Sequence, residues 1–369
     1  MINKERIVQK FMEYVQISSP STKEKEFAEF IKEELESIGL DVSMDRSGEK
    51  FGSNSGNIIA RLAGDRRTQP ILFSCHLDTV SPGEGIQPII KGDAIYSRGD
   101  TILGADDKAG IAAVIEALRV IKENHIPHGP IEVVFSVCEE KGLLGAKHLD
   151  YNSLQSKRAF VLDSGGSPGE IITQGPAQDS FHVKILGKAA HAGVSPEEGI
   201  SAIHVAAHAI AGMKLLRIDE ETTANIGVIH GGEATNIVAP EVVLEGEARS
   251  LDEDKLDEQS GHMVEVFERT AQKFGAQIEI TREREYNAFR VDEEDEIVHL
   301  VKKACKNIGI EAYTSKTGGG SDTNVFNANG IKAVNLATGE RKPHTLEEYL
   351  IIDDLVKTAK MVMEIIKEG

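Results

Sequence analysis

The chain has 369 residues, of which 40% are hydrophobic and 27% charged, as in an ordinary globular protein. This length exceeds what a single hydrophobic core usually serves, so it predicts two domains. The formal net charge of −19 leaves nothing to neutralise a phosphate backbone, so nucleic acid is excluded as a partner.

No apolar stretch approaches the roughly 18 residues that a membrane span needs, so no membrane partner is expected. Residues 1–16 are charged and amphipathic rather than typical of a signal peptide, which predicts a cytoplasmic protein. Three cysteines, with no CxxC spacing, predict neither a disulfide framework nor a thiolate metal site. We expect each to be a small buried side chain: Cys75, Cys138 and Cys305.

The first part of the chain alternates strand-like and helix-like patterns. Ser21 and Glu24 have the spacing of a capping box, ahead of a helical apolar repeat that stops at Gly39. Compact apolar runs predict strands within 57–63, 70–78, 131–140 and 157–166, and the apolar spacing over 106–123 predicts a helix. Strands that alternate with helices predict an α/β domain with a mainly parallel sheet, covered on both faces.

From about residue 178 the pattern changes to the order β-α-β-β-α-β, a two-layer unit that can bury its own core. We therefore predict a second domain over 178–287, inserted into the first. The α/β pattern returns after residue 287 and closes with a helix expected over 346–367. The segments 1–177 and 288–369 would then form one discontinuous domain.

Potential metal ligands stand at the carboxyl ends of three predicted strands. Open α/β sheets bind ligands at that edge, where residues far apart in sequence converge. The candidates are His76 and Asp78, Glu139 and Glu140, and Asp163.

Further candidates stand just before predicted helices. Asp106 and Asp107 stand ahead of the helical apolar repeat that begins at Ile111, and His344 precedes the last helix. Thr345 and Glu348 form a second capping box, which we expect to anchor that last helix and hold the imidazole of His344.

Two imidazoles, several carboxylates and no thiolate suit zinc in a hydrolytic site, or cobalt or manganese in its place. One zinc takes about three protein ligands and keeps a position open for water. Five candidates fill two such sites if one carboxylate is shared. They are His76, Asp106, Glu140, Asp163 and His344.

The remaining acids have roles in such a site. Asp78 lies two residues after His76, so on an extended chain both side chains face the same way, and its carboxylate can orient the imidazole. Glu139 neighbours a ligand without having to be one. It can take a proton from the activated water and deliver it to the leaving amine.

Together these motifs resemble, in chain order, the metal and catalytic motifs of the M20 metallopeptidase family, and most of all its peptidase T group. The resemblance covers essentially the whole chain and rests on HLDT, GADDKAG, EEKGLLGA, the VLD that ends at Asp163, and the HT at 344–345. Only 28 positions separate Asp78 from Asp106, fewer than in peptidase T itself, so segments near the substrate pocket differ and the tripeptide preference stays open.

The resemblance implies a role for each of these residues. Asp106 would bridge two metals, with His76 and Asp163 on one and Glu140 and His344 on the other. Glu139 would be the general acid/base, and Asp78 would orient His76. The family fold pairs a zinc-peptidase α/β domain with a ferredoxin-like lid that usually mediates dimerisation, so a homodimer is implied, and the Asp106–Asp107 peptide is commonly cis.

The inserted domain carries a second group of candidates. His191 stands in a loop of small residues, and the resemblance implies that it reaches an active site, often the partner subunit's, and stabilises the oxyanion. Asn236 and Arg249 resemble the positions that hold the substrate carboxylate, which the fork of an arginine matches. The alternatives are an exposed surface histidine, a turn asparagine and a strand ion pair.

We therefore expect a dinuclear metal-dependent aminopeptidase that acts on short peptides, tripeptides above all. The alternative keeps the same machinery in a carboxypeptidase, a dipeptidase or an N-acyl amino acid deacylase. A non-catalytic binding protein on a degenerate scaffold is disfavoured, because Glu139 and all five metal ligands are present.

Overall fold

The computed structural model describes residues 1–369, which separate into two compact units. The first unit comprises Met1–Thr173, Arg290–Lys316 and Ser321–Gly369, and the second comprises Gln174–Phe289 and Thr317–Gly320. The insert predicted over 178–287 lies inside the second unit. No helix in either unit is both long and apolar enough to cross a membrane.

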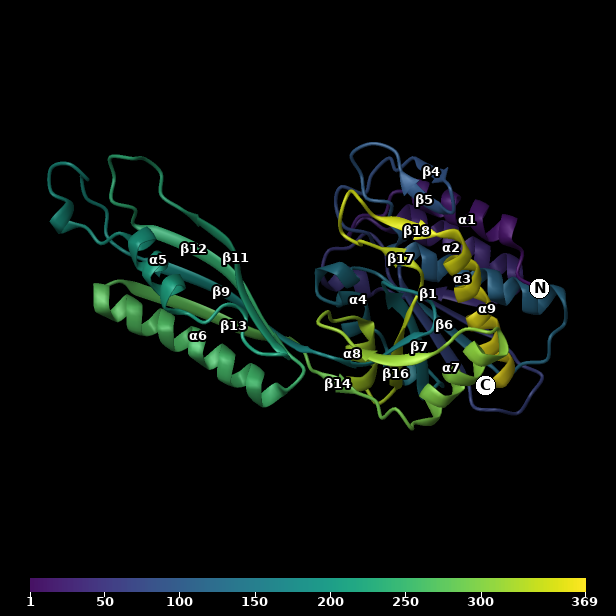
Figure 1. Ribbon diagram of the computed structural model, residues 1–369. Coiled ribbons are helices and arrows are strands. Elements are labelled where there is room, and N and C mark those ends of the chain that lie inside the picture. Colours follow the sequence, from purple (N-terminus) through teal and green to yellow (C-terminus); the bar gives the residue numbers. More distant parts are fainter. The chain divides into compact units, whose positions relative to one another are not determined.

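A nine-stranded sheet runs through the first unit (Figure 1). Its strands are β1 (Asp41–Met44), β2 (Ile58–Leu62), β3 (Ile71–His76), β6 (Ile131–Ser136), β7 (Arg158–Ser164), β8 (Glu170–Gly175), β14 (Phe289–Arg290), β15 (Tyr313–Lys316) and β16 (Lys332–Ala337). They follow the order β1-β2-β6-β3-β7-β16-β8-β14, with β15 beside β8. The four central strands β6, β3, β7 and β16 are parallel, whereas β1, β2 and β8 pair antiparallel, so the expectation of a mainly parallel sheet is confirmed at its centre.

Helices cover both faces of this sheet (Figure 1). They are α1 (Lys4–Gln16), α2 (Lys25–Ile38), α3 (Ala105–Glu123), α4 (Leu144–Lys147), α7 (Glu296–Asn307), α8 (Asp322–Ala328) and α9 (Ile352–Glu368). Because side chains alternate along a strand, Leu72 packs in one core with Phe326 of α8, while Cys75 faces α3 on the other side. A Cβ at Gly110 of α3 would lie 2.9 Å from the Cys75 sulfur, so the close helix–sheet contact there requires glycine.

A small antiparallel sheet, not predicted from the sequence, lies beside the start of the last helix. It consists of β4 (Pro88–Lys91), β5 (Ala94–Ser97), β17 (Glu340–Arg341) and β18 (Tyr349–Ile351), in the order β17-β18-β5-β4. The prediction of a helix from residue 346 is therefore wrong. Tyr349 pairs with Tyr96 on β5, their rings stack at 5.2 Å, and α9 begins only at Ile352.

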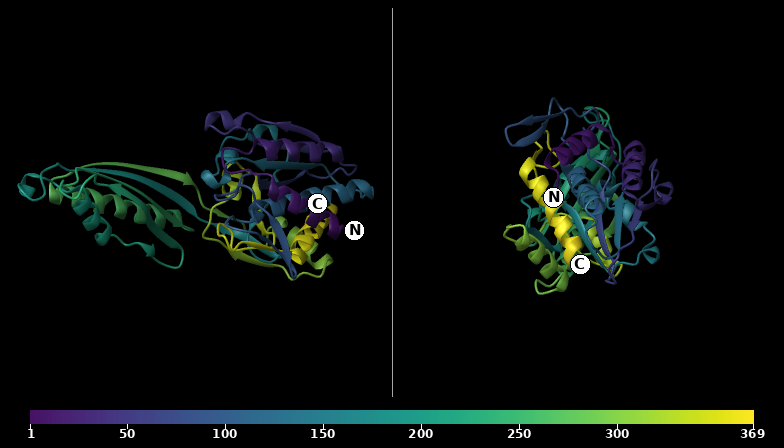
Figure 2. Two further views of the ribbon diagram at one scale, coloured as in Figure 1. Left: turned by 90° about the horizontal axis from the view of Figure 1, so that it is seen from above. Right: turned by 90° about the vertical axis from the view of Figure 1, so that its right-hand side faces the viewer.

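The second unit is a five-stranded antiparallel sheet with two helices. Its elements are β9 (Ala177–Leu186), α5 (Ala202–Gly212), β10 (Leu216–Arg217), β11 (Thr222–Gly231), β12 (Glu241–Ser250), α6 (Glu253–Phe274) and β13 (Gln277–Tyr286). The strand order is β10-β11-β12-β9-β13. Both helices bury their apolar faces against the same side of the sheet (Figure 2). The predicted β-α-β-β-α-β order is present, with the two-residue strand β10 added.

Candidate metal centre

The carboxyl ends of three parallel strands bring the candidate ligands together. His76 is the last residue of β3, Glu139 and Glu140 lie on a short helix just after β6, and Asp163 is near the end of β7. Potential ligand atoms of His76, Asp106 and Glu140 lie within 4.8 Å of one another, as do those of His76, Glu139 and Asp163. The fold thus gathers side chains that are up to 87 positions apart in these two groups.

Asp106 lies between two imidazoles. Its Oδ1 is 3.0 Å from Nε2 of His76, and its Oδ2 is 3.2 Å from Nε2 of His344. Each imidazole also faces a second carboxylate, since Asp163 lies 3.6 Å from Nε2 of His76 and Glu140 lies 2.7 Å from Nε2 of His344. The five residues therefore form two half-sites, each with one histidine and one carboxylate of its own, that share the carboxylate of Asp106.

Asp78 faces the imidazole of His76 with two of its oxygens. Nδ1 of His76 lies 2.9 Å from the backbone carbonyl oxygen of Asp78 and 3.5 Å from its carboxylate. That carboxylate instead accepts hydrogen bonds from the backbone N–H groups of Glu139 and Glu140 and from the hydroxyl of Ser21, at 2.9, 3.3 and 2.7 Å. Asp78 thus fixes both the imidazole and the segment that carries the two glutamates.

The capping role predicted for Ser21 and Glu24 is wrong, because α2 begins at Lys25 without a side-chain cap. The hydroxyl of Ser21 binds Asp78, and the carboxylate of Glu24 accepts hydrogen bonds from the backbone N–H of Cys138 at 3.0 Å and from the hydroxyl of Ser53 at 2.8 Å. Both residues therefore support the segment that leads into Glu139. The spacing S-x-x-E alone does not distinguish these long-range contacts from a helix cap.

Asp107, a candidate from the sequence together with Asp106, lies against the backbone of His76. Its carboxylate is buried and accepts the backbone N–H of His76 at 3.1 Å. The Asp106–Asp107 peptide bond is cis, as the family resemblance implied.

The pKa values of these groups are shifted because several carboxylates lie close together in a buried site. Burial raises the pKa of Asp163 to about 7, although the hydrogen bond with His76 opposes this. Burial, reinforced by Asp163, also raises the pKa of Glu139 well above its usual range. Hydrogen bonds with Asp106 and Glu140 raise the pKa of His344 to about 10. Such a cluster suits divalent cations, which compensate the carboxylates, and its nitrogen and oxygen donors fit zinc, cobalt or manganese.

Two of the candidates on the second unit lie side by side. His191 is exposed, and its Nδ1 accepts the backbone N–H of Gly193 at 3.2 Å. It forms a β-bridge with Ile237, and the carbonyl of Asn236 accepts the N–H of Ala192 at 2.9 Å. His191 and Asn236 therefore belong to one exposed loop pair.

Arg249 lies elsewhere on the second unit. It is near the last residue of β12, where its guanidinium binds Glu247 through two hydrogen bonds of 3.0 and 2.9 Å. The loop pair adjoins the opposite end of that strand, at Glu241, so at about 3.3 Å per residue roughly 26 Å of sheet lies between them. One copy of this unit does not bring Arg249 together with His191 and Asn236.

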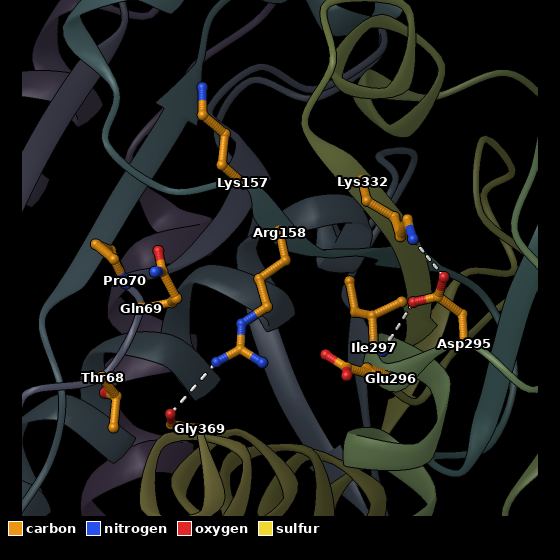
Figure 3. Close-up of a pocket in the computed structure, with 10 residues that line it drawn as sticks. All are labelled: Thr68, Gln69, Pro70, Lys157, Arg158, Asp295, Glu296, Ile297, Lys332 and Gly369. Carbon is orange, nitrogen blue, oxygen red and sulfur yellow. Dashed lines mark hydrogen bonds and ion pairs between the residues drawn. The ribbon is translucent and has the colours of Figure 1, made fainter.

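The amino end of the parallel sheet holds a cavity of about 480 Å³ (Figure 3). It is lined by residues that precede or begin β3, β7 and β16 and by the start of α7. Two of its charged side chains have partners in the cavity: Lys332 pairs with Asp295, and Nη2 of Arg158 donates to the carbonyl of Gly369 at 3.3 Å. This cavity is at the opposite strand ends from the metal-ligand cluster and contains none of its residues.

The chain is similar to known proteins over its whole length. A family model described as peptidase family M20/M25/M40 matches residues 72–368. The uncharacterized protein YqjE of Bacillus subtilis is 45% identical over the full length of both chains. Aminopeptidase PepT from Bacillus cereus is 45% identical with a TM-score of 0.90, covering 100% of this chain and 99% of that one. A tripeptidase from Staphylococcus aureus is 43% identical with a TM-score of 0.95, covering 100% and 98%.

Proposed function

The chain belongs to the peptidase family M20/M25/M40, and we propose that it is a dinuclear metal-dependent aminopeptidase that releases the N-terminal residue of short peptides, tripeptides above all. The observation that carries this proposal is the pair of half-sites that share Asp106. Two solved structures at 43–45% identity, named as an aminopeptidase and a tripeptidase, support the substrate class, since each matches this chain over nearly its whole length.

The ligands divide between two metal ions in this proposal. His76 and Asp163 would hold one ion, Glu140 and His344 the other, and Asp106 both, with zinc as the native metal and cobalt or manganese as substitutes. When bound, such ions polarise the scissile carbonyl and lower the pKa of the attacking water.

Glu139 moves the proton in this reaction. It is only 8% exposed and lies against His76 and Asp163, next to the ligand Glu140. Its carboxylate takes one proton from the attacking water and then gives it to the nitrogen of the leaving amine, so that the peptide C–N bond breaks without a net proton change on the enzyme. Asp78 keeps Glu139 in place through its backbone N–H.

Recognition of the substrate would involve Arg249, Asn236 and His191. A tripeptide spans roughly 10 Å, since an extended residue covers at most about 3.6 Å, whereas roughly 26 Å separates Arg249 from the loop of His191. One peptide can therefore meet both groups only if they come from two copies of the chain. This favours a homodimer in which Arg249 binds the peptide carboxylate while His191 and Asn236 act on the partner's substrate.

The compartment is the cytoplasm in this proposal. All three cysteines are free and buried, as we expected, which fits a reducing compartment.

A panel of peptides tests the proposed function. Metal-reconstituted protein is incubated with a free tripeptide, its N-acetyl and C-amide forms, a dipeptide and an N-acyl amino acid, and the products are identified by mass spectrometry. The Glu139→Gln variant, purified in parallel, reports contaminating peptidases. We expect the N-terminal residue to be released fastest from the free tripeptide. Hydrolysis of the N-acyl amino acid while the free tripeptide stays intact would assign the protein to the deacylases instead.

A further inference from the structure

Glu348 is a buried carboxylate that binds a row of backbone N–H groups. Only 2% of the residue is exposed. Its Oε2 accepts the N–H groups of Leu103 and Gly104 at 2.7 and 2.8 Å, and its Oε1 accepts those of Ala105 and Asp106 at 2.7 and 3.2 Å. Four consecutive donors thus converge on one carboxylate.

These four donors belong to the segment that starts α3 and presents Asp106. Asp106 and Asp107 have non-helical φ/ψ angles at the start of α3, so the buried N–H groups of this segment need a partner from elsewhere in the chain. Burial raises the pKa of Glu348 to about 7, and the backbone N–H groups oppose this by favouring the charged form, to which hydrogen bonds are about twice as strong as to a neutral group. Glu348 therefore fixes the backbone on which the shared carboxylate stands.

The same glutamate lies at the end of the two successive turns that follow Lys342 and include His344. The backbone N–H of Glu348 donates to the carbonyl of Thr345 at 3.1 Å, and the hydroxyl of Thr345 donates to the carbonyl of Lys342 at 2.9 Å. His344 lies within the first of these turns with a φ of +62°, a conformation that few residues adopt without support from their surroundings. One residue thus connects the segments of two metal ligands that face each other at 3.2 Å.

We propose that Glu348 is a positioning residue for the metal centre, which sets the separation between Asp106 and His344. The inference rests on the proposed dinuclear function. Glu348 contacts the backbone of the Asp106 segment, so its effect on the metals passes through the ligands that it holds. The capping role predicted for Glu348 at the last helix is wrong, since α9 begins four residues later and this carboxylate binds the segment that leads into α3.

Glu132 provides a matched control. It is also a buried glutamate, 3% exposed, and its Oε2 accepts the backbone N–H groups of Gln155 and Ser156 at 3.0 and 2.8 Å, while Arg61 binds Oε1 at 3.2 Å. It lies near the start of β6, at the end of the sheet away from the metal ligands. Its loss removes comparable hydrogen bonds without disturbing the segments of Asp106 or His344.

The test compares the full-length Glu348→Gln and Glu132→Gln variants with the wild type. In Glu348→Gln the amide nitrogen presents hydrogens to two of the four N–H groups, so the segment of Asp106 must shift. Zinc affinity of the metal-free proteins is measured by competition with a chromophoric chelator, and the cobalt-loaded forms are compared by visible absorption spectra. Thermal unfolding of the metal-free proteins shows how much stability each variant has lost.

We expect Glu348→Gln to weaken zinc binding by about 10–100-fold, as loss of a group that orients ligands typically does, and to change the cobalt spectrum. Glu132→Gln should lower the unfolding temperature and leave zinc affinity within about twofold of wild type. Equal zinc affinity in Glu348→Gln and wild type would overturn the inference. If the glutamine variant does not fold, Glu348→Asp, which keeps the charge but is one methylene shorter, takes its place with the same expectation.

Failure of this inference can be told apart from failure of the proposed function, because zinc binding is measured without any peptide. A wild type that binds two metals but cleaves no tripeptide contradicts the substrate assignment and leaves the role of Glu348 intact. A Glu348→Gln variant that binds zinc like the wild type refutes the role of Glu348, whatever the peptide panel shows.

Discussion

The two ends of the central sheet use charged residues in opposite ways. At the amino end side chains of both signs line the cavity, and Lys332 forms an ion pair with Asp295. At the carboxyl end Asp106, Glu139 and Asp163 crowd together with too few cations to match them. We therefore expect divalent cations to bind at the carboxyl end of these strands and not at the amino end.

Removal of metal should have the largest effect, because only the carboxyl end depends on it. We expect a chelator to abolish peptide hydrolysis and added zinc, cobalt or manganese to restore it, as measured by release of the N-terminal residue. Circular dichroism should show that the fold of the first unit persists without metal, since its core does not include the ligands. Full activity in protein shown to be metal-free would contradict the account.

Replacement of Glu139 should have the next largest effect. Glutamine keeps the size of the side chain but cannot carry the proton, so Glu139→Gln should lower kcat by about 10²–10⁴-fold while two metals remain bound. Steady-state kinetics and metal analysis of the same sample check both expectations. A glutamine variant that turns over at the wild-type rate would remove Glu139 from the mechanism.

Metal affinity should depend on pH in a direction set by the raised pKa values. Asp106 and Glu140 raise the pKa of His344 to about 10, and burial raises the pKa of Asp163 to about 7. Near neutral pH these ligands hold protons that a metal must displace, so affinity should rise with pH, by up to about tenfold per pH unit for each proton released. Calorimetry in buffers of different ionisation enthalpy counts the protons. An affinity that is constant between pH 6 and 8 would show that the ligands bind without deprotonation.

A change at the amino end should have the smallest effect. Lys332→Met removes the ion pair with Asp295, in which the lysine is about half exposed, so we expect a loss of no more than about 1 kcal/mol in the free energy of unfolding. The kcat/KM for tripeptides and the zinc affinity should not change. A loss of zinc affinity in Lys332→Met, measured by chelator competition, would contradict the claim that metal binding depends only on the carboxyl end of the sheet.

The parts of the fold that follow from local pattern could be predicted from the sequence. The apolar runs that became β2, β3, β6 and β7 are buried on both faces, so their composition alone marks them as strands. Those strands carry or lead into His76, Glu139 and Asp163, so the candidate site followed from the rule that parallel sheets bind at their carboxyl ends.

The supporting contacts could not be predicted, because they join distant segments. Glu348 binds Leu103 across 245 positions, and Ser21 binds Asp78 across 57. In both places the sequence shows only the local S/T-x-x-E spacing, which predicts a cap for the helix that follows. Likewise, the sequence around Arg249 does not reveal that this residue lies near one end of β12, whereas the loop of His191 adjoins the other end.

Anomalous X-ray diffraction from zinc-grown crystals tests the central claim most directly. Data collected on both sides of the zinc absorption edge locate the ions without assumptions about the mechanism. We predict two peaks per chain, one beside His76 and Asp163 and one beside Glu140 and His344, with Asp106 between them. A single peak, or zinc bound only away from these residues, would contradict the dinuclear centre.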